Sequence, residues 1–347
     1  MAVALAVRVS APIDTSVRYL GLQLRHPFIV GASPLSANLD TVRRLEDAGA
    51  AAIVLPSLFE EQITEARTGR IGEMDQVDPR FSALLLAYPN FADYAFTPEL
   101  YLEHIRRVKA AIGVPVIGSL NGTSSGAWLK WGELIQNAGA DALELNFYEI
   151  AADPDVPGIA IEISIRDAVS DLKRSLRIPV SVKLPPFFTA FANLADSLDR
   201  AGVDGLVMFN RFFQRDIDIE ALKEITVLEL SSSAELLLRL HWIASLHGRL
   251  RASLAVSGGI SGPDDGIKAI LAGADVVQSV SGLFRNGPAF IDSLVNGLTR
   301  WMEAHDIRAI SDVRGRAQFG KAADTSEYER AAYLRTINRT DGKMGTR

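Results

Sequence analysis

The sequence predicts an α/β protein folded as one (β/α)8 barrel, and three observations support this. Four segments repeat a pattern in which a helix ends in Ala-Gly and an apolar run follows shortly after. Eight apolar runs occur along the chain, each followed by a helical pattern. Composition does not change midway, which argues against two domains. The repeated segments are DAGAAAIVLPS (47–57), NAGADALELNF (137–147), RAGVDGLVMFN (200–210) and LAGADVVQSVS (271–281).

The elements follow from the residue pattern. Glycine after a last helical turn takes the left-handed conformation without steric cost. Continuous apolar runs fit strands that are buried on both faces of a parallel sheet. We expect such strands at Phe28–Ala32, Ala51–Leu55, Pro115–Leu120, Ala142–Asn146, Val180–Leu184, Gly205–Phe209, Leu254–Ser257 and Val276–Ser279. Helices are expected at Leu39–Ala48, Pro98–Ile112, Ala127–Ala138, Ile161–Leu176, Ala190–Ala201, Ala234–Leu246, Pro263–Ala272 and Pro288–Ala304.

An open doubly wound sheet is the structural alternative. Its glycine-rich first turn would have to be GASPLS (31–36), which lacks the Gly-x-Gly-x-x-Gly spacing. In a barrel, the long connections 57–97 and 211–233 would lie over the mouth as candidate lids. We expect the barrel to occupy residues 1–320, with a short strand or ordered arm at its start. A C-terminal helix and flexible tail would occupy residues 321–347.

Composition narrows the functional classes. The chain has 347 residues, 48% hydrophobic and 22% charged, as expected of a globular protein with a large core. A net charge of −6 argues against nucleic acid as the main partner, and no apolar run reaches the roughly 20 residues that span a bilayer. The absence of cysteine excludes disulfides, thiolate metal sites and a catalytic thiol, and it fits a cytoplasmic location. The five histidines show no metal-binding spacing.

Two glycine-rich turns predict a phosphate site. Gly258 and Gly259 follow the seventh expected strand, and Ser279–Gly282 follow the eighth. In barrels these two loops and a helix N-terminus commonly surround a phosphate with backbone N–H groups, to which Ser281 could add a hydroxyl. The alternative is a pair of tight turns that merely need glycine.

Polar residues at three other strand ends predict a binding site for a flat heterocycle. Lys183 ends the fifth strand, where a buried ammonium needs a partner: a cofactor or substrate anion, or an acid such as Glu144 or Glu162. Glu144 and Asn146 share one face of the fourth strand by its period of two. Asn210 ends the sixth strand. The asparagines offer amide donors and acceptors, although each alone could be a turn residue.

Several motifs in order resemble the cytosolic class 1 dihydroorotate dehydrogenases. They are RHPFIVGASP (25–34), SVKLPPFF (181–188), SGGI (257–260), AGADVVQ (272–278) and LFRNGPAF (283–290). The resemblance extends from about Val17 to about Arg316. It implies a (β/α)8 barrel that holds FMN at its mouth, often as a homodimer, and oxidises dihydroorotate in pyrimidine biosynthesis. With no cysteine for an iron–sulfur cluster on this chain, a separate electron-transfer partner could carry one.

The resemblance also assigns roles to residues of this chain. Lys183 corresponds to the lysine at the pyrimidine edge of the flavin, and Asn146 and Asn210 to asparagines that bind flavin or substrate. Cofactor-binding positions correspond to Ala32, Ser33, Ser57, Asn146, Gly258, Gly259 and Ser281.

The catalytic loop departs from the family. The family's Asn-x-Ser-Cys-Pro-Asn reads NFYEIAA (146–152) here, so that Glu149 stands where cysteine acts as the base. The family's Lys-Ser after the second strand is Pro56-Ser57, and the first Asn of a substrate loop is Leu84. A neutral or cationic substrate therefore fits better than dihydroorotate, whose carboxylate Glu149 would repel. A silenced FMN-binding barrel acting as a binding partner, or a flavin-free lyase or isomerase using Lys183, are the alternatives.

Overall fold

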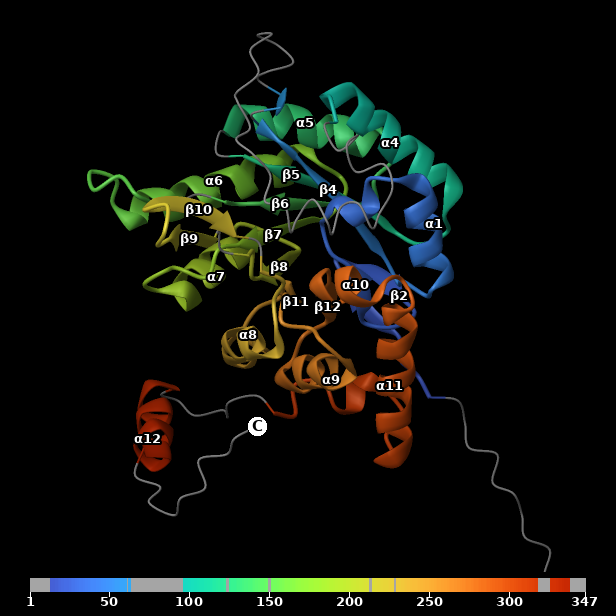
Figure 1. The fold of residues 1–347 in the computed structure, drawn as a ribbon, viewed down its shortest axis with the longest axis vertical. Helices are drawn as coiled ribbons and strands as arrows, with labels where there is room; N and C mark the ends of the chain where they lie inside the picture. The colour runs from blue at the N-terminus through green and yellow to red at the C-terminus, as the bar shows by residue number, and fades with distance from the viewer. Residues whose placement is uncertain are drawn as a thin grey trace, which may run out of the picture.

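The computed structural model describes residues 13–60, 62–63, 96–122, 125–148, 151–211, 214–227, 229–317 and 325–337. Its centre is a closed barrel of eight parallel strands, in the ring order β11-β12-β3-β4-β5-β6-β7-β8 (Figure 1). The predicted (β/α)8 fold is confirmed, and each expected strand has a counterpart. The strands are β3 (Phe28–Val30), β4 (Ile53–Phe59), β5 (Val116–Asn121), β6 (Ala142–Asn146), β7 (Val180–Leu184), β8 (Gly205–Met208), β11 (Ser253–Ser257) and β12 (Val276–Ser279).

Helices surround this barrel and bury one side against it. In α7 (Phe191–Arg200), Leu194 and Leu198 are buried, whereas Asn193 and Arg200 are exposed. Proline begins α4 (Pro98–Ala111) and α9 (Pro263–Ala272), where the first helical position needs no backbone donor. The remaining helices are α1 (Leu39–Asp47), α5 (Ser125–Asn137), α6 (Gly158–Ser175), α8 (Ser233–Leu246), α10 (Ser281–Asn286), α11 (Phe290–Ala304) and α12 (Thr325–Ile337).

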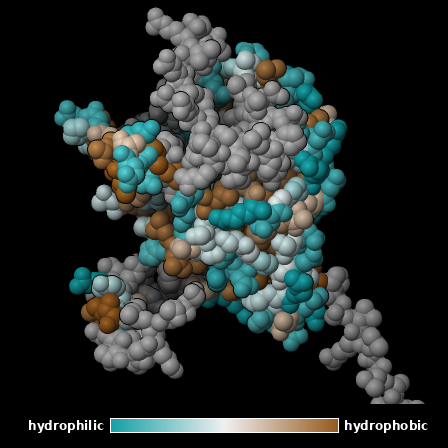
Figure 2. Space-filling model, in the orientation of Figure 1, coloured by the Kyte–Doolittle hydropathy of each residue, from teal (hydrophilic) through white to brown (hydrophobic). Residues whose placement is uncertain are grey.

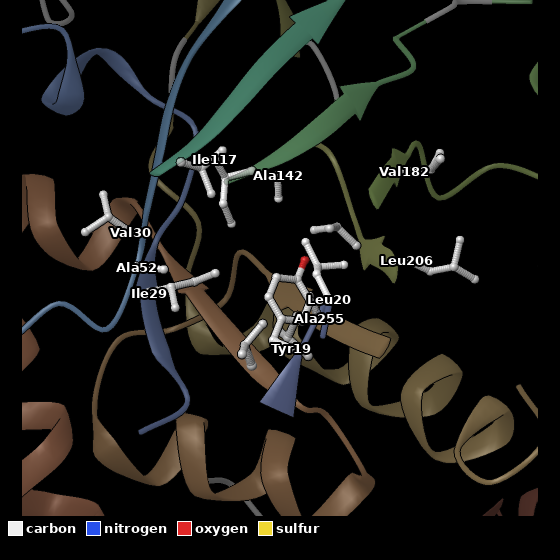
Figure 3. Packing of buried hydrophobic residues seen from close by; sticks show 14 of the residues in the cluster. Tyr19, Leu20, Ile29, Val30, Ala52, Ile117, Ala142, Val182, Leu206 and Ala255 are labelled. Atoms are coloured by element: carbon white, nitrogen blue, oxygen red, sulfur yellow. The ribbon is translucent and has the colours of Figure 1, made fainter. Parts of the chain in front are cut away.

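An N-terminal hairpin, which the sequence had not predicted in this form, closes the floor of the barrel. Strands β1 (Val17–Tyr19) and β2 (Leu22–Leu24) pair antiparallel. Tyr19 and Leu20 are buried, and Figure 3 shows them among inward-facing residues such as Ile29 and Ala255. The hairpin therefore excludes water from the lower end of the barrel core.

The repeated Ala-Gly-x-Asp segments form clamps at the floor. Asp141, Asp204 and Asp275 each stand two residues after the capping glycine and begin the turn into a strand. Each carboxylate accepts a 2.7 Å hydrogen bond from the first or second backbone N–H of the preceding strand, on β5, β7 and β11 respectively. Each is also paired with a cation, namely Lys109, Lys173 and Arg314. The first repeat has Ala51 in this place and lacks the clamp.

A second set of clamps stands three residues before the same glycines. Glu46, Gln136 and Asp199 each accept two backbone N–H bonds from the loop that leads into β5, β7 or β11. The fourth helix has Ile270 in this place. The two sets explain why the sequence repeats: they tie neighbouring strands from β4 round to β12 together, at the end of the barrel where such fixed polar contacts serve stability.

The end of the second barrel strand and the content of the expected lids differ from the sequence prediction. The second barrel strand continues to Phe59 instead of ending at Leu55, because a register shift between Val54 and Ser57 accommodates Pro56, which cannot donate a ladder hydrogen bond. Ser57 therefore lies within β4 and not in a loop after it. Most of the expected lid 57–97 lies outside the described residues. The other expected lid contains the antiparallel hairpin of β9 (Gln214–Asp218) and β10 (Lys223–Val227).

The surface carries two further features. Figure 2 shows hydrophobic side chains over the β9–β10 hairpin, where Ile217, Ile219 and Leu222 are exposed. A cavity of about 650 Å³ opens at the floor, beside the β1–β2 hairpin. Its charged lining residues include Asp199, Asp204 and Asp275, which are committed to the clamps described above, so we place the candidate site at the opposite end. No helix among the described residues is long and apolar enough to cross a bilayer.

Candidate functional site at the barrel mouth

Three neighbouring strands end in polar side chains at one level of the barrel. Asn121 on β5 pairs in register with Asn146 on β6, which pairs with Lys183 on β7. Residues paired across parallel strands face the same side of the sheet, and all three are buried at 9%, 8% and 5% exposure. The structure thus brings the predicted Asn146 and Lys183 together. The sequence analysis missed Asn121, which stands one residue beyond the expected strand end.

Lys183 lies over a buried carboxylate. Its Nζ is 3.7 Å from Glu144 Oε1, the nearer of the two acids that the sequence offered as partners. Glu144 Oε2 accepts a 2.6 Å hydrogen bond from Gln278 Nε2, which reaches across the barrel from β12. At 3.7 Å the ion pair is longer than a hydrogen bond. The described residues therefore give the Lys183 ammonium an opposite charge but no hydrogen-bond acceptor.

The two predicted asparagines contact each other. Asn210 Nδ2 donates to Asn146 Oδ1 at 2.6 Å, and Asn210 Oδ1 accepts from the Arg211 backbone N–H at 2.9 Å. These bonds fix both amide planes at the ends of β6 and β8. Among the described residues nothing accepts from the Asn146 amide N–H groups, so both could donate to a ligand in the mouth.

The two predicted phosphate loops meet at a serine that the sequence analysis missed. Ser231, just before α8, accepts from Gly259 N at 3.0 Å, and its hydroxyl lies 2.9 Å from Ser281 Oγ. Ser281 Oγ also accepts from Ser231 N at 3.1 Å. Whichever hydroxyl donates to the other, one O–H of the pair remains free to donate to an anion. The run of three serines at 231–233 was the available signal.

The glycines at this end are required by geometry. Gly258 and Gly259 have φ of +85° and +81°, the left-handed region that favours glycine. A Cβ on Gly259 would lie 2.6 Å from the backbone nitrogen of Leu236, at the start of α8. The Gly258–Gly259 loop therefore lies directly against the N-terminus of a helix that begins with a capping box formed by Ser232 and Glu235.

Arginines stand behind the phosphate loops. Arg239 is buried, and its Nε donates to the carbonyl of Ser257 at 2.6 Å. Arg285 donates to the carbonyls of Leu230 and Ser231 and so fixes the serine that joins the loops. Burial lowers the pKa of Arg239 and of Arg211, and the proximity of these two cations lowers the pKa of Arg239 further. Glu235, 3.9 Å from Arg239, and Glu229 offset part of this positive charge.

Other predicted cofactor positions line the first two strands. Ser33, after β3 and beside Ala32, is buried, and its Oγ has no hydrogen-bond partner in the described part of the chain. Ser279 Oγ at the end of β12 and Gln278 Oε1 are likewise buried without one. Ser57 Oγ lies 2.7 Å from Ser119 Oγ on β5. Buried polar atoms are almost always paired, so the unpaired atoms indicate a ligand or water at the mouth.

Some expected features cannot be placed in this site. The predicted base Glu149 lies outside the described residues, as does Leu84. His26 and His104 are buried and bond to the carbonyls of Gly49 and Ser36. Burial lowers the pKa of His26 to about 4, so it is neutral near pH 7. Within the described ranges, no three His, Cys, Asp or Glu residues are arranged to hold a metal ion.

Comparison with known proteins identifies the family. The sequence model of the family described as "Dihydroorotate dehydrogenase" matches residues 97–302, which is more than half of the chain. The match runs from α4 into α11 and includes Asn121, Asn146, Lys183, Asn210 and both glycine loops, whereas Ser33 and Ser57 precede it.

Curated relatives extend the similarity over nearly the whole chain. The catalytic subunit of dihydroorotate dehydrogenase B (NAD(+)) of Thermoplasma acidophilum is 26% identical over 87% of this chain and 98% of its own length. A putative dihydroorotate dehydrogenase A (fumarate) of Aeropyrum pernix is 28% identical over 59% of this chain and 68% of its own. The NAD-dependent dihydropyrimidine dehydrogenase subunit PreA of Escherichia coli K12 is 24% identical over 88% and 77%.

Proposed function

The chain belongs to the dihydroorotate dehydrogenase family, and on this premise we propose that it is an FMN-dependent oxidoreductase acting on a neutral ring substrate. Membership of this family supports an oxidoreductase activity for the chain. The cofactor, the hydride transfer and the substrate are our proposal, for which the mouth of the barrel gives the reasons.

The Lys183 ammonium is the observation that carries the proposal. It is buried at the mouth, charged, and without a hydrogen-bond acceptor among the described residues. The N1–C2=O edge of a flavin is electron-rich and would supply that acceptor. Ser33 Oγ, Ser279 Oγ and Gln278 Oε1 are further unpaired polar atoms near this end of the barrel. The residues present therefore fit an isoalloxazine ring with its pyrimidine edge toward Lys183.

The phosphate of FMN fits the other end of the mouth. Gly258 and Gly259 hold the tight backbone turn of one loop, and Ser281 places a hydroxyl in the other. In the hydrogen-bonded pair of Ser231 and Ser281, one O–H remains free to donate. Arg239 and Arg285 add positive charge behind these loops. A dianionic phosphate there is stabilised by hydrogen bonds to donors and by the field of the cations.

The proposed chemistry divides roles among the mouth residues. FMN, when bound, supplies a ring nitrogen, N5, that accepts hydride from a substrate C–H. Lys183 stabilises the negative charge that develops at the N1–C2=O edge. The paired amides of Asn146 and Asn210 orient the substrate ring. Glu149, three residues after Asn146, takes the proton from the neighbouring substrate carbon as general base.

The charges of the mouth favour a neutral substrate. Within the eight barrel strands, all of which the structure describes, Lys183 is the one cation and Glu144 the one anion, and they face each other. Pro56 replaces the family's second lysine and offers no charge. A substrate carboxylate about 5 Å from Glu149 would be repelled by about 3 kcal/mol at an effective dielectric of 20. A 5,6-dihydropyrimidine without a carboxylate avoids this repulsion. The relative PreA is named as a dihydropyrimidine dehydrogenase subunit, which supports this class of substrate.

Steady-state kinetics with an artificial electron acceptor test this substrate choice. We expect kcat/KM for 5,6-dihydrouracil to exceed that for dihydroorotate by about 100-fold, which corresponds to the repulsion above. In Glu149→Gln, binding of dihydroorotate should improve while proton abstraction is lost. Equal or better kcat/KM with dihydroorotate in the unmodified enzyme would refute the charge argument and restore dihydroorotate as the substrate.

A separate electron-transfer subunit is the proposed partner. Two of the relatives are named as a catalytic subunit or as a subunit of an NAD-dependent enzyme. This chain has no cysteine for an iron–sulfur cluster, so electrons leaving FMN toward NAD would pass through another chain. We further propose a homodimer of this chain, as the family resemblance implies.

A further inference from the structure

The buried carboxylate of Glu144 has no role in the function proposed so far. Interior positions of barrels of this kind are filled mainly by branched apolar side chains. Glu144 is only 1% exposed and stands one level below Asn146 on β6. A charge at that depth is costly unless it is paired, so its presence calls for a physical reason.

Glu144 is held from the opposite wall of the barrel. In the ring of eight strands, β12 lies four strands away from β6 in either direction, so Gln278 approaches the carboxylate from across the interior. The 2.6 Å hydrogen bond from Gln278 Nε2 engages Oε2 and leaves Oε1 toward Lys183. Oε1 is buried and accepts no hydrogen bond from the residues that the structure describes. The carboxylate is thus fixed on one side and presents its other oxygen to the lysine alone.

Tyr19 marks the lower boundary of this arrangement. Its hydroxyl is buried, and Ser181 is the polar side chain beside it. Burial raises the pKa of Tyr19 far above its usual range, and the nearby Glu144 charge raises it further. Tyr19 therefore stays neutral and adds no second negative charge beside Glu144. Within the barrel strands, Lys183 is the one cation facing that carboxylate.

We propose that Glu144 is a positioning residue that holds the Lys183 ammonium at the base of the mouth and offsets part of its charge, which makes the bound flavin harder to reduce. This inference rests on the proposed function, because it concerns FMN at Lys183. A lysine alone would stabilise the negative edge of reduced FMN with its full charge. With Glu144 at 3.7 Å from the ammonium, the pair is neutral overall. Its field at the flavin is that of a dipole, which is weaker than the field of a single positive charge.

The test is a reductive titration of the FMN-loaded protein with dithionite in the presence of a reference dye. Dithionite supplies two electrons, solvent supplies the proton that binds N5, and the remaining negative charge lies at the N1–C2=O edge. We expect Glu144→Gln to raise the ratio of reduced to oxidised flavin at a fixed potential by about tenfold. For a two-electron couple that is an upward shift of about 30 mV.

A matched control removes the same charge from the surface. Glu133 is exposed on α5, and Glu133→Gln should leave the ratio within twofold of the unmodified protein. Glu144→Asp keeps the charge but withdraws it by one methylene, so its ratio should lie between those of the unmodified protein and Glu144→Gln. This variant also serves if Glu144→Gln does not fold.

The outcomes distinguish a failure of this inference from a failure of the proposed function. Suppose that the unmodified protein binds FMN and that its ratio of reduced to oxidised flavin is within twofold of that of Glu144→Gln. Glu144 then does not act on the flavin, and this inference is overturned while the proposed function stands. An Asp variant with a ratio equal to or below that of the unmodified protein overturns it as well. If the unmodified protein takes up no FMN, the proposed function and this inference are overturned together.

Discussion

Replacing Lys183 with methionine is expected to destabilise the FMN-free protein by about 3–4 kcal/mol. The ammonium is 3.7 Å from Glu144 Oε1, and both side chains are almost fully buried. At an effective dielectric of 20 the attraction at that distance is about 4.5 kcal/mol. Removing one partner of a buried pair leaves the other charge uncompensated, which typically costs about 3–5 kcal/mol. Methionine refills the volume, so packing loss adds little.

The stability of the double variant tests the same electrostatic attraction more sharply. Lys183→Met combined with Glu144→Gln leaves no buried charge, and a neutral replacement of a buried pair is often nearly neutral for stability. We therefore expect the double variant to be within about 1 kcal/mol of the unmodified protein. The amide oxygen that Glu144→Gln introduces can still accept the hydrogen bond from Gln278 Nε2 that the carboxylate accepts now.

Urea denaturation of the three variants and the unmodified protein, all without FMN, measures these differences as a double-mutant cycle. The cycle isolates the attraction between the two charges, so the coupling free energy should be about 4.5 kcal/mol with unchanged m-values. If the double variant is destabilised by the sum of the two single effects, Lys183 and Glu144 do not interact, and the electrostatic account of the mouth is wrong.

Three further predictions concern other parts of the molecule. Asp275→Asn should lower the free energy of unfolding by about 1–3 kcal/mol, because the Asp275 carboxylate binds both Leu254 N and Arg314. The control Asp171→Asn, on the surface of α6, should have no effect in the same urea titration. Ser281→Ala should weaken FMN binding about tenfold but leave riboflavin, which lacks the phosphate, within twofold, as fluorescence titration would show; equal losses would remove Ser281 from the phosphate site. Burial lowers the pKa of His26 to about 4, so the unfolded chain binds the proton first, and stability should be complete above about pH 6.5 and fall by about 3 kcal/mol toward pH 4. His26→Asn should flatten that part of the stability curve measured by thermal unfolding.

The barrel could be predicted because its strands are uninterrupted apolar runs that end in a glycine-capped repeat. All eight strands and the eight helices between them lie where the pattern places them, within a few residues. The β9–β10 hairpin was missed although DIDI (216–219) and EITV (224–227) alternate polar and apolar residues as a solvent-exposed strand does. Pro56 concealed the end of β4, because a proline normally breaks a strand and here occupies a register shift.

The site was only partly within reach of the sequence. Lys183, Asn146 and Asn210 were identified because they end buried strands, where polar residues are unexpected. Gln278 was missed because it lies 134 residues from Glu144, and only closure of the barrel brings the two together. Ser231 was missed because its role depends on two glycine loops converging from other strands. Contacts across a closed barrel are set by topology, which a local pattern does not contain.

The most direct test of the central claim is the visible spectrum of the purified protein before and after anaerobic addition of 5,6-dihydrouracil. We predict the absorption bands of oxidised flavin, with one FMN per chain, and their loss within a single turnover when the substrate is added. A protein that lacks flavin bands even after incubation with FMN would contradict the account at its foundation. Bands that persist with 5,6-dihydrouracil but bleach with dihydroorotate would contradict the proposed substrate and retain the flavin.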